Sequence, residues 1–117
     1  MAELSIINSK VVNEGKVQEL DVYIKDGRIE KISDGLETKG EVIDASGLYL
    51  LPGVIDDQVH FREPGLTERG DINSESRAAV AGGTTSFMDM PNVIPPTLNH
   101  DLWTKKNEIA KKNSLAN

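Results

Sequence analysis

The feature that most constrains this chain begins at Pro52, where two rounds of strand, loop and helix follow one another. Residues 54–61 are β-rich, a loop rich in Pro, Gly and charge comes next, and residues 72–81 have helical spacing. The second round has a β-rich run at residues 84–90 and a helical pattern at residues 99–112. Because alternating strands and helices with short connections are typical of parallel sheets covered by helices, we predict an α/β fold after Pro52.

The chain before Pro52 has a different pattern, of short strands and tight turns. The β-rich runs occupy residues 4–12, 20–24, 42–43 and 48–51. Asp26-Gly27 separates two apolar-patterned segments and suits a type I′ hairpin turn, since Gly tolerates positive φ. We expect a small antiparallel β domain over residues 1–51 and assign it no chemistry, because it contains no cluster of convergent polar groups.

Two strand–helix units cannot form a stable domain alone, because parallel strands are buried on both faces. A closed (β/α)8 TIM barrel needs about 250 residues and eight strands. We therefore predict that residues 52–117 are the first two βα units of such a barrel. On this interpretation the barrel is incomplete in this chain, which is a piece of a longer protein.

Composition argues against several classes of function. The formal net charge of -6 disfavours general binding to nucleic acid, which needs clustered Lys and Arg. The one Lys-rich stretch, Lys105, Lys106, Lys111 and Lys112, falls on a predicted helix, and we interpret it as a solvated face. No run approaches the ~18 apolar residues of a membrane span, so we predict a cytoplasmic protein without membrane contact. With no cysteine, a metal site must use His, carboxylate or a modified side chain.

The candidate chemistry lies at the end of the first strand after Pro52. Gln58, His60 and Arg62 occupy every second position, and the residues between them are apolar. Side chains two residues apart in a strand share a face, so the pattern predicts three polar groups on one side of the strand. A TIM barrel carries its active site at this end of its strands. Asn92 follows the second strand at the same predicted end, either as a turn former or as a donor to a substrate oxygen.

Each of the first-strand groups has a functional and a structural interpretation. His60 is a candidate metal ligand, although lone histidines are more often structural or solvent-facing. Arg62 offers a planar fork of donors that matches a carboxylate, and an ion pair with Glu63 or Glu68 is the alternative. Asp56 lies on the same predicted face, and we favour a buried carboxylate bonded to neighbouring strands over a metal ligand.

Four segments together resemble one known family. They are Pro52-Gly53-Val54-Ile55-Asp56, Val59-His60-Phe61-Arg62-Glu63-Pro64-Gly65, Ala78-Ala79-Val80-Ala81-Gly82-Gly83-Thr84-Thr85 and Met90-Pro91-Asn92. They resemble dihydroorotase of the amidohydrolase superfamily, and the N-terminal strands resemble the small β-sandwich-type domain before its metal-dependent-hydrolase barrel. Allantoinases commonly carry Asn where Arg62 stands and an extra residue in the Met-Pro-Asn element. Hydantoinases usually lack the Arg-Glu-Pro-Gly run, so Arg62 and Asn92 favour dihydroorotase.

The resemblance implies reversible, zinc-dependent cyclisation of N-carbamoyl-L-aspartate to L-dihydroorotate in pyrimidine biosynthesis. It implies that Arg62 and Asn92 bind the substrate carboxylate and that His60 is a ligand of one or two zinc ions. A metal-bound hydroxide would attack the amide carbonyl. The expected partners are the small-molecule substrate, further copies of the same chain, and aspartate transcarbamoylase.

One residue departs from the family pattern, which is His-x-His where this chain has Gln58-Val59-His60. A carboxamide oxygen is a poorer zinc ligand than an imidazole nitrogen. Three outcomes stay open: the metal binds with Gln58 or with fewer ligands, the enzyme works with one metal, or catalysis is lost. We favour a working enzyme, because Gln58 stands inside an otherwise intact substrate-binding motif.

The remaining family elements, namely a carboxylated lysine, two later histidines and a general-base aspartate, are absent from these 117 residues. We therefore predict that this chain alone is inactive. Two alternatives to a dihydroorotase parent are a non-catalytic, dihydroorotase-like scaffold subunit and a related cyclic-amide hydrolase of the allantoinase or hydantoinase type.

Overall fold

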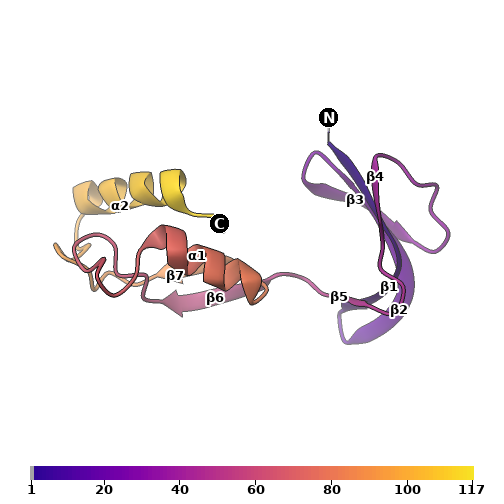
Figure 1. The fold of residues 1–117 in the computed structure, drawn as a ribbon, viewed down its shortest axis with the longest axis horizontal. Coiled ribbons are helices and arrows are strands. Elements are labelled where there is room, and N and C mark those ends of the chain that lie inside the picture. Colours follow the sequence, from indigo (N-terminus) through magenta and orange to yellow (C-terminus); the bar gives the residue numbers. More distant parts are fainter. Residues whose placement is uncertain (1) are drawn as a thin grey trace. The chain divides into compact units, whose positions relative to one another are not determined.

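The computed structural model describes residues 2–117, which form two compact units divided after Pro52 (Figure 1). The secondary structure is mixed, with more strands than helices. This agrees with the predicted α/β class. No helix among the described residues is long and apolar enough to cross a membrane.

The first unit is one mixed sheet. Its strands are β1 (Glu3–Asn13), β2 (Lys16–Lys25), β3 (Arg28–Ser33), β4 (Glu41–Asp44) and β5 (Tyr49–Leu50). The strand order is β3-β2-β1-β4, and β5 also pairs with β1. Strands β4 and β5 run parallel to β1, so the expectation of a purely antiparallel layer is wrong. The reason is the connection after β3, which carries the chain from one edge of the sheet to the other before β4 begins.

The β2–β3 hairpin forms at the predicted turn. Asp26 and Gly27 have φ values of 50° and 74°, as a type I′ turn requires. Beneath the sheet, Val22 is 3% exposed, and the hydroxyls of the buried residues Ser5 and Ser9 donate hydrogen bonds to backbone carbonyls. Local turn chemistry and a small core thus account for the fold of this unit.

The second unit contains the two predicted strand–helix pairs. Its elements are β6 (Val54–Val59), α1 (Ile72–Ala81), β7 (Thr84–Asp89) and α2 (His100–Asn113). Strands β6 and β7 pair in parallel, as expected. The backbone of Asn117 lies beside β7, since its N–H donates to Thr85 O at 3.0 Å and its carbonyl accepts from Phe87 N at 2.9 Å. Asn117 therefore pairs with β7 on the edge that β6 leaves open.

Caps fix where the two helices begin. Asp71 accepts a hydrogen bond from Ser74 N at 2.7 Å, and the Ser74 hydroxyl lies 3.3 Å from Asp71 N, which completes a capping box. The side chain of Glu63 also accepts from Ile72 N at 2.9 Å. The Asn99 side chain accepts from Leu102 N at 3.0 Å and so caps α2. Both helices therefore start within one residue of their predicted positions.

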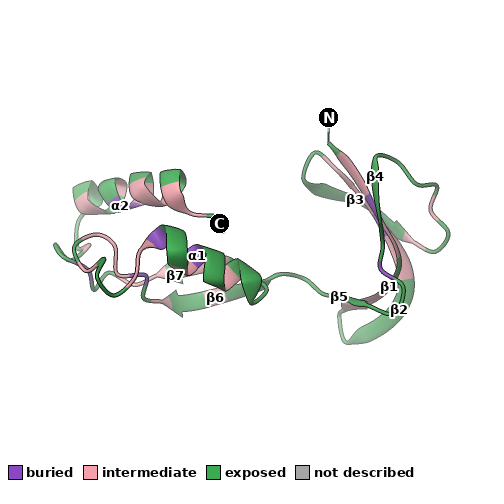
Figure 2. Ribbon diagram, viewed as in Figure 1, coloured by how far each residue is buried: buried purple, intermediate pink, exposed green. Residues whose placement is uncertain are grey.

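The core of the second unit lies where the loops after β6 and β7 meet α1. Phe61, Ile72 and Val93 are between 1% and 6% exposed, and the Phe61 ring packs at 4.5 Å from that of Phe87. Strand β6 is mostly exposed (Figure 2), and its residue Ile55 is 67% exposed. Parallel strands are normally covered on both faces, so within residues 2–117 the apolar side chains of β6 lack their cover.

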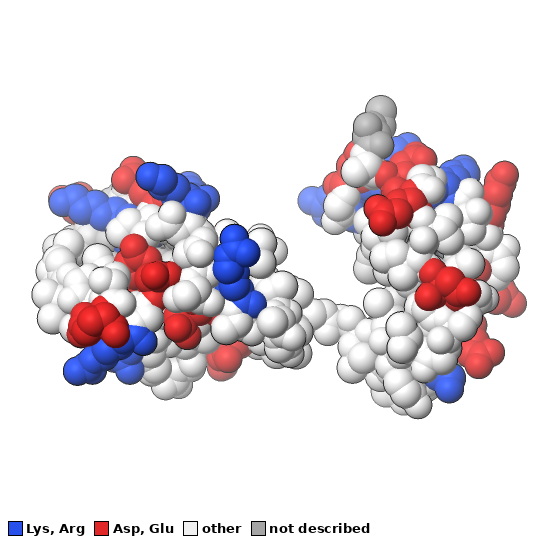
Figure 3. Space-filling model, in the orientation of Figure 1, with Lys and Arg blue, Asp and Glu red and all other residues white. Residues whose placement is uncertain are grey.

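Charged side chains are dispersed over both units. On the face drawn in Figure 3, Lys and Arg side chains alternate with Asp and Glu. They form no continuous basic surface there of the kind that tracks a phosphate backbone.

Candidate active site

The first strand ends earlier than the sequence predicts. Strand β6 stops at Val59, whose last partner on β7 is Asp89, so His60 and Arg62 lie in the following loop. Arg62 has φ of 65°, an unusual value for a residue with a side chain. The predicted single strand face carrying Gln58, His60 and Arg62 is therefore wrong. The alternation is lost because the chain turns as soon as the ladder ends.

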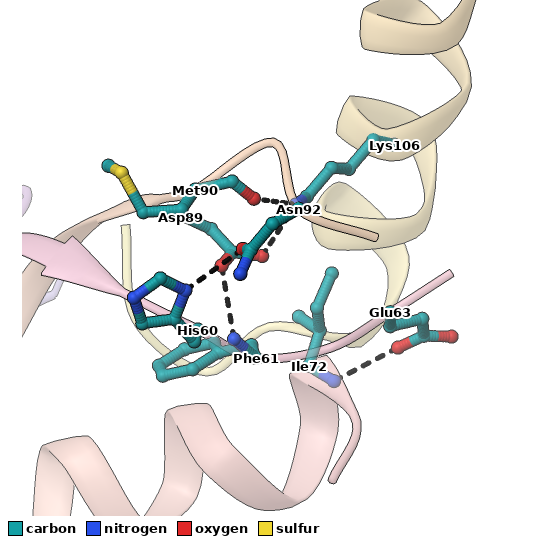
Figure 4. Close-up of polar contacts among 8 residues, drawn as sticks. All are labelled: His60, Phe61, Glu63, Ile72, Asp89, Met90, Asn92 and Lys106. Carbon is teal, nitrogen blue, oxygen red and sulfur yellow. Dashed lines mark hydrogen bonds and ion pairs between the residues drawn. The ribbon is translucent and has the colours of Figure 1, made fainter. Parts of the chain in front are cut away.

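The loop nevertheless brings two of the predicted site residues together. His60 Nδ1 lies 2.9 Å from Asn92 Oδ1 (Figure 4), although the two residues follow different strands. Because a carboxamide oxygen can only accept, this contact requires a proton on Nδ1, which in a neutral imidazole leaves the lone pair on Nε2. The contact uses the oxygen of Asn92. Its Nδ2 group has no partner within residues 2–117 and can donate to another molecule. Both side chains are exposed.

A buried ion pair lies behind this contact. Lys106 Nζ, from α2, is 2.8 Å from Asp89 Oδ2, and their side chains are 11% and 7% exposed. Asp89 Oδ1 accepts from Phe61 N at 3.0 Å, and Lys106 also donates to Met90 O at 2.9 Å (Figure 4). These contacts join the ends of both strands to the helix.

The interpretation of Lys106 as part of a solvated face is wrong. Its three companions in the Lys-rich stretch are exposed, whereas Lys106 is buried. The signal that could have identified it is helical spacing: Lys106 stands four residues after Leu102 and three before Ile109, on the apolar stripe of α2.

Arg62 is half-buried and forms no ion pair within residues 2–117. Neither of the two alternative partners pairs with Arg62. Glu63 caps α1 through Ile72 N, and Glu68 lies 3.7 Å from Arg69. An unpaired, half-buried guanidinium is available to an anionic ligand.

The two other candidate polar side chains of β6 are those of Asp56 and Gln58. Asp56 accepts a hydrogen bond from Gln58 N at 3.1 Å, within its own strand. The expected bond to a neighbouring strand is therefore wrong for the described residues. The Gln58 side chain is exposed.

The described residues do not fit a metal ion on their own. Within residues 2–117, no group of three or more His, Cys, Asp or Glu side chains is arranged to hold one. A zinc site takes at least three protein ligands. His60 offers one imidazole, and Asp89 is occupied by Lys106 and Phe61.

A cavity of about 620 Å³ lies between β7 and α2, but the site residues do not line it. Asp89 and Lys106 border this cavity, whereas His60, Arg62 and Asn92 do not. The candidate site is therefore on the surface of the described residues rather than inside them.

No family model matches this sequence. It is 43% identical over 112 residues to a dihydroorotase of Carboxydothermus hydrogenoformans, and the match covers 92% of this chain and 26% of that protein. It is 39% identical over 114 residues to an allantoinase of Bacillus velezensis, and the match covers 96% of this chain and 25% of that protein. Among solved structures, an L-hydantoinase of Arthrobacter aurescens superposes with a TM-score of 0.93 at 31% identity, over 100% of this chain and 27% of that one.

This chain belongs to the amidohydrolase superfamily. Within the superfamily its relatives are cyclic-amide hydrolases, and the chain spans about a quarter of the length of the curated relatives it matches. Their names include both dihydroorotase and allantoinase at similar identity, so overall similarity does not choose between these activities. The activity therefore has to be assigned from individual side chains of the site.

Proposed function

We propose that the whole protein to which this sequence belongs is a dihydroorotase. It would interconvert N-carbamoyl-L-aspartate and L-dihydroorotate, with Arg62 and Asn92 binding the substrate carboxylate. The observation that carries the proposal is the 2.9 Å contact between His60 and Asn92, which turns the carboxamide so that its oxygen is occupied and its Nδ2 donor is free.

The charge of the site fits an anionic ring. The guanidinium of Arg62 has no carboxylate partner within residues 2–117, and the neighbouring Glu63 instead accepts from Ile72 N. A carboxylate that accepts from Arg62 and from Asn92 Nδ2 would gain a charge-assisted and a neutral hydrogen bond. An uncharged ring would leave the half-buried guanidinium without an opposite charge beside it. The arrangement therefore favours a substrate with a carboxylate.

The proposed cofactor is zinc, as one or two ions in the whole protein. His60 would contribute Nε2, and the other ligands would come from outside residues 2–117. Zinc in such a site polarises a carbonyl and activates water. The part that this chain plays is to orient His60 and to hold the substrate carboxylate at a fixed place beside it.

The same assignment leads to proposals for the fold, location and assembly of the whole protein. We propose that residues 52–117 are the first two βα units of a TIM barrel and that residues 1–51 belong to a composite β-sandwich beside it. We further propose a cytoplasmic homo-oligomer, with aspartate transcarbamoylase as a candidate partner. The 117-residue chain alone would be inactive, because it supplies one imidazole of the metal site.

The test compares Arg62→Ala with the unaltered whole protein on dihydroorotate and on dihydrouracil, the same ring without the carboxylate. Losing the charged partner of a desolvated carboxylate costs at least about 2 kcal/mol, or roughly 30-fold in kcat/KM. We expect that loss on dihydroorotate alone. Arg69→Ala is the control, because Arg69 is in the same loop with its side chain 64% exposed.

Two results would redirect the assignment. The allantoinase relatives at 39% and 42% identity make allantoin the first competing substrate. Turnover of allantoin without turnover of dihydroorotate would support that activity instead. Gln58, in the place of a ligand histidine, makes a non-catalytic scaffold the second alternative. A purified whole protein with no bound zinc and no turnover of any cyclic amide would support the scaffold.

A further inference from the structure

We propose that Asp89 and Lys106 are positioning residues that hold the His60–Asn92 contact and Arg62 in place. The proposal rests on the proposed function only for the substrate that the site receives. The geometric part concerns two strand ends and one helix, all within the described residues.

Asp89 reaches from the end of β7 to the loop after β6. Its Oδ1 accepts from the backbone N–H of Phe61, which stands between His60 and Arg62. The ring of Phe61 is buried against Phe87, so this backbone segment is held from two sides. One carboxylate of β7 thus fixes the place from which both His60 and Arg62 project.

Lys106 holds the other strand end. Its Nζ donates to the carbonyl of Met90, two residues before Asn92, while it pairs with Asp89 Oδ2. A single ammonium group therefore connects α2 to the loop that carries Asn92 and, through Asp89, to the loop that carries His60. Figure 4 shows this path from the helix to both site residues.

Removing the charge of Lys106 would leave the buried carboxylate of Asp89 unpaired. Asp89 Oδ2 is buried and accepts no hydrogen bond of good geometry within residues 2–117, so among these residues only the nearby charge of Lys106 compensates it. A buried carboxylate without its cation is strongly unfavourable and moves toward water. Such a movement pulls Oδ1 away from Phe61 N and releases both loops together. A displacement of about 1 Å at a reacting geometry is enough to lower activity about 100-fold.

A lysine that only docked α2 would affect stability but not substrate discrimination. The relevant readout is therefore the ratio of kcat/KM on dihydroorotate to kcat/KM on dihydrouracil. Misplacing Arg62 and Asn92 lowers this ratio, because only the first substrate has the carboxylate that they bind. General destabilisation lowers both values equally.

The experiment uses the whole protein with Lys106→Met and with Asp89→Asn. Lys106→Met keeps the length of the side chain and removes the charge, while Asp89→Asn keeps an acceptor for Phe61 N. The matched control is Lys105→Met, on the exposed side of the same helix turn. We expect Lys106→Met to reduce the ratio by about tenfold to 100-fold, Asp89→Asn by less, and Lys105→Met to leave it unchanged. Lys106→Arg should recover part of the loss.

A second readout needs no activity. Hydrogen exchange at the Phe61 amide should become about tenfold faster in Lys106→Met, as its hydrogen bond to Asp89 weakens. Should Lys106→Met fail to fold, Asp89→Asn carries the test, and we expect the same two effects at smaller size, because a neutral amide holds both Phe61 N and Lys106 more weakly than the carboxylate does. An unchanged ratio with unchanged exchange at Phe61 would overturn the proposal.

The two proposals fail differently. A protein without turnover of dihydroorotate contradicts the proposed function, and exchange at Phe61 then decides the positioning role alone. A dihydroorotase whose Lys106→Met variant keeps its ratio and its exchange protection contradicts the positioning role alone.

Discussion

Gly65 lies where the loop after β6, which carries Arg62, packs against the loop after β7, which carries Asn92. A substitution at Gly65 therefore tests this packing. It has φ of +84°, and a Cβ built there would overlap the backbone oxygen of Ile94 and approach Ile94 Cβ at 2.7 Å. The two loops are also joined by a hydrogen bond from Ile94 N to Pro64 O at 3.1 Å. Gly65→Ala therefore forces the loop of Arg62 away from the loop of Asn92.

Two costs add in Gly65→Ala. The positive φ costs an L-residue about 1–2 kcal/mol, and overpacking against Ile94 costs about 1–3 kcal/mol more. Gly83→Ala supplies the control, since Gly83 has φ of +92° and nothing within 4 Å of the added Cβ. It should cost only the first term. The difference between the two variants thus measures the close approach of the loops, at about 1–3 kcal/mol.

The assay is reversible urea unfolding of the whole protein and both variants, with the KM for dihydroorotate measured alongside. We expect Gly65→Ala to be the less stable variant and the only one with a raised KM. Equal losses of unfolding free energy, within about 0.5 kcal/mol, would refute the packing of the loops described above.

Two further predictions concern the metal and the pH dependence. Gln58→His restores an imidazole at the second position before His60, so it should raise the zinc affinity of the whole protein in a metal titration, and an unchanged affinity would contradict the ligand assignment. The backbone N–H of Ser74, followed by its hydroxyl, lowers the pKa of Asp71. The stabilisation from Asp71 is then complete above the pKa of an unfolded aspartate, about 3.9, and is lost as the pH falls through the lower folded value. Asp71→Ala should therefore lower the melting temperature at pH 7 and have little effect at strongly acidic pH, and a difference independent of pH would count against the capping role.

Local signals predicted the elements of the second unit well. Helix α1 begins and ends as expected because Asp71 caps it and Gly82 follows it, and both signals act within a few residues. The hairpin at Asp26-Gly27 formed for the same reason. Such features need no knowledge of the rest of the chain.

The errors came from contacts between segments distant in sequence. The end of β6 at Val59 depends on where β7 stops pairing, and the burial of Lys106 depends on Asp89, 17 residues earlier. The sequence pattern suggested a shared strand face for His60 and Arg62. The structure instead turns the chain after Val59. His60 and Asn92 still meet, because each follows one of two paired parallel strands.

The most direct test of the proposed substrate site is a crystal structure of the whole protein with dihydroorotate bound. We predict that the substrate carboxylate lies within about 3 Å of both the Arg62 guanidinium and Asn92 Nδ2, with His60 still in contact with Asn92 Oδ1. A carboxylate bound elsewhere, with Arg62 directed into solvent, would contradict it.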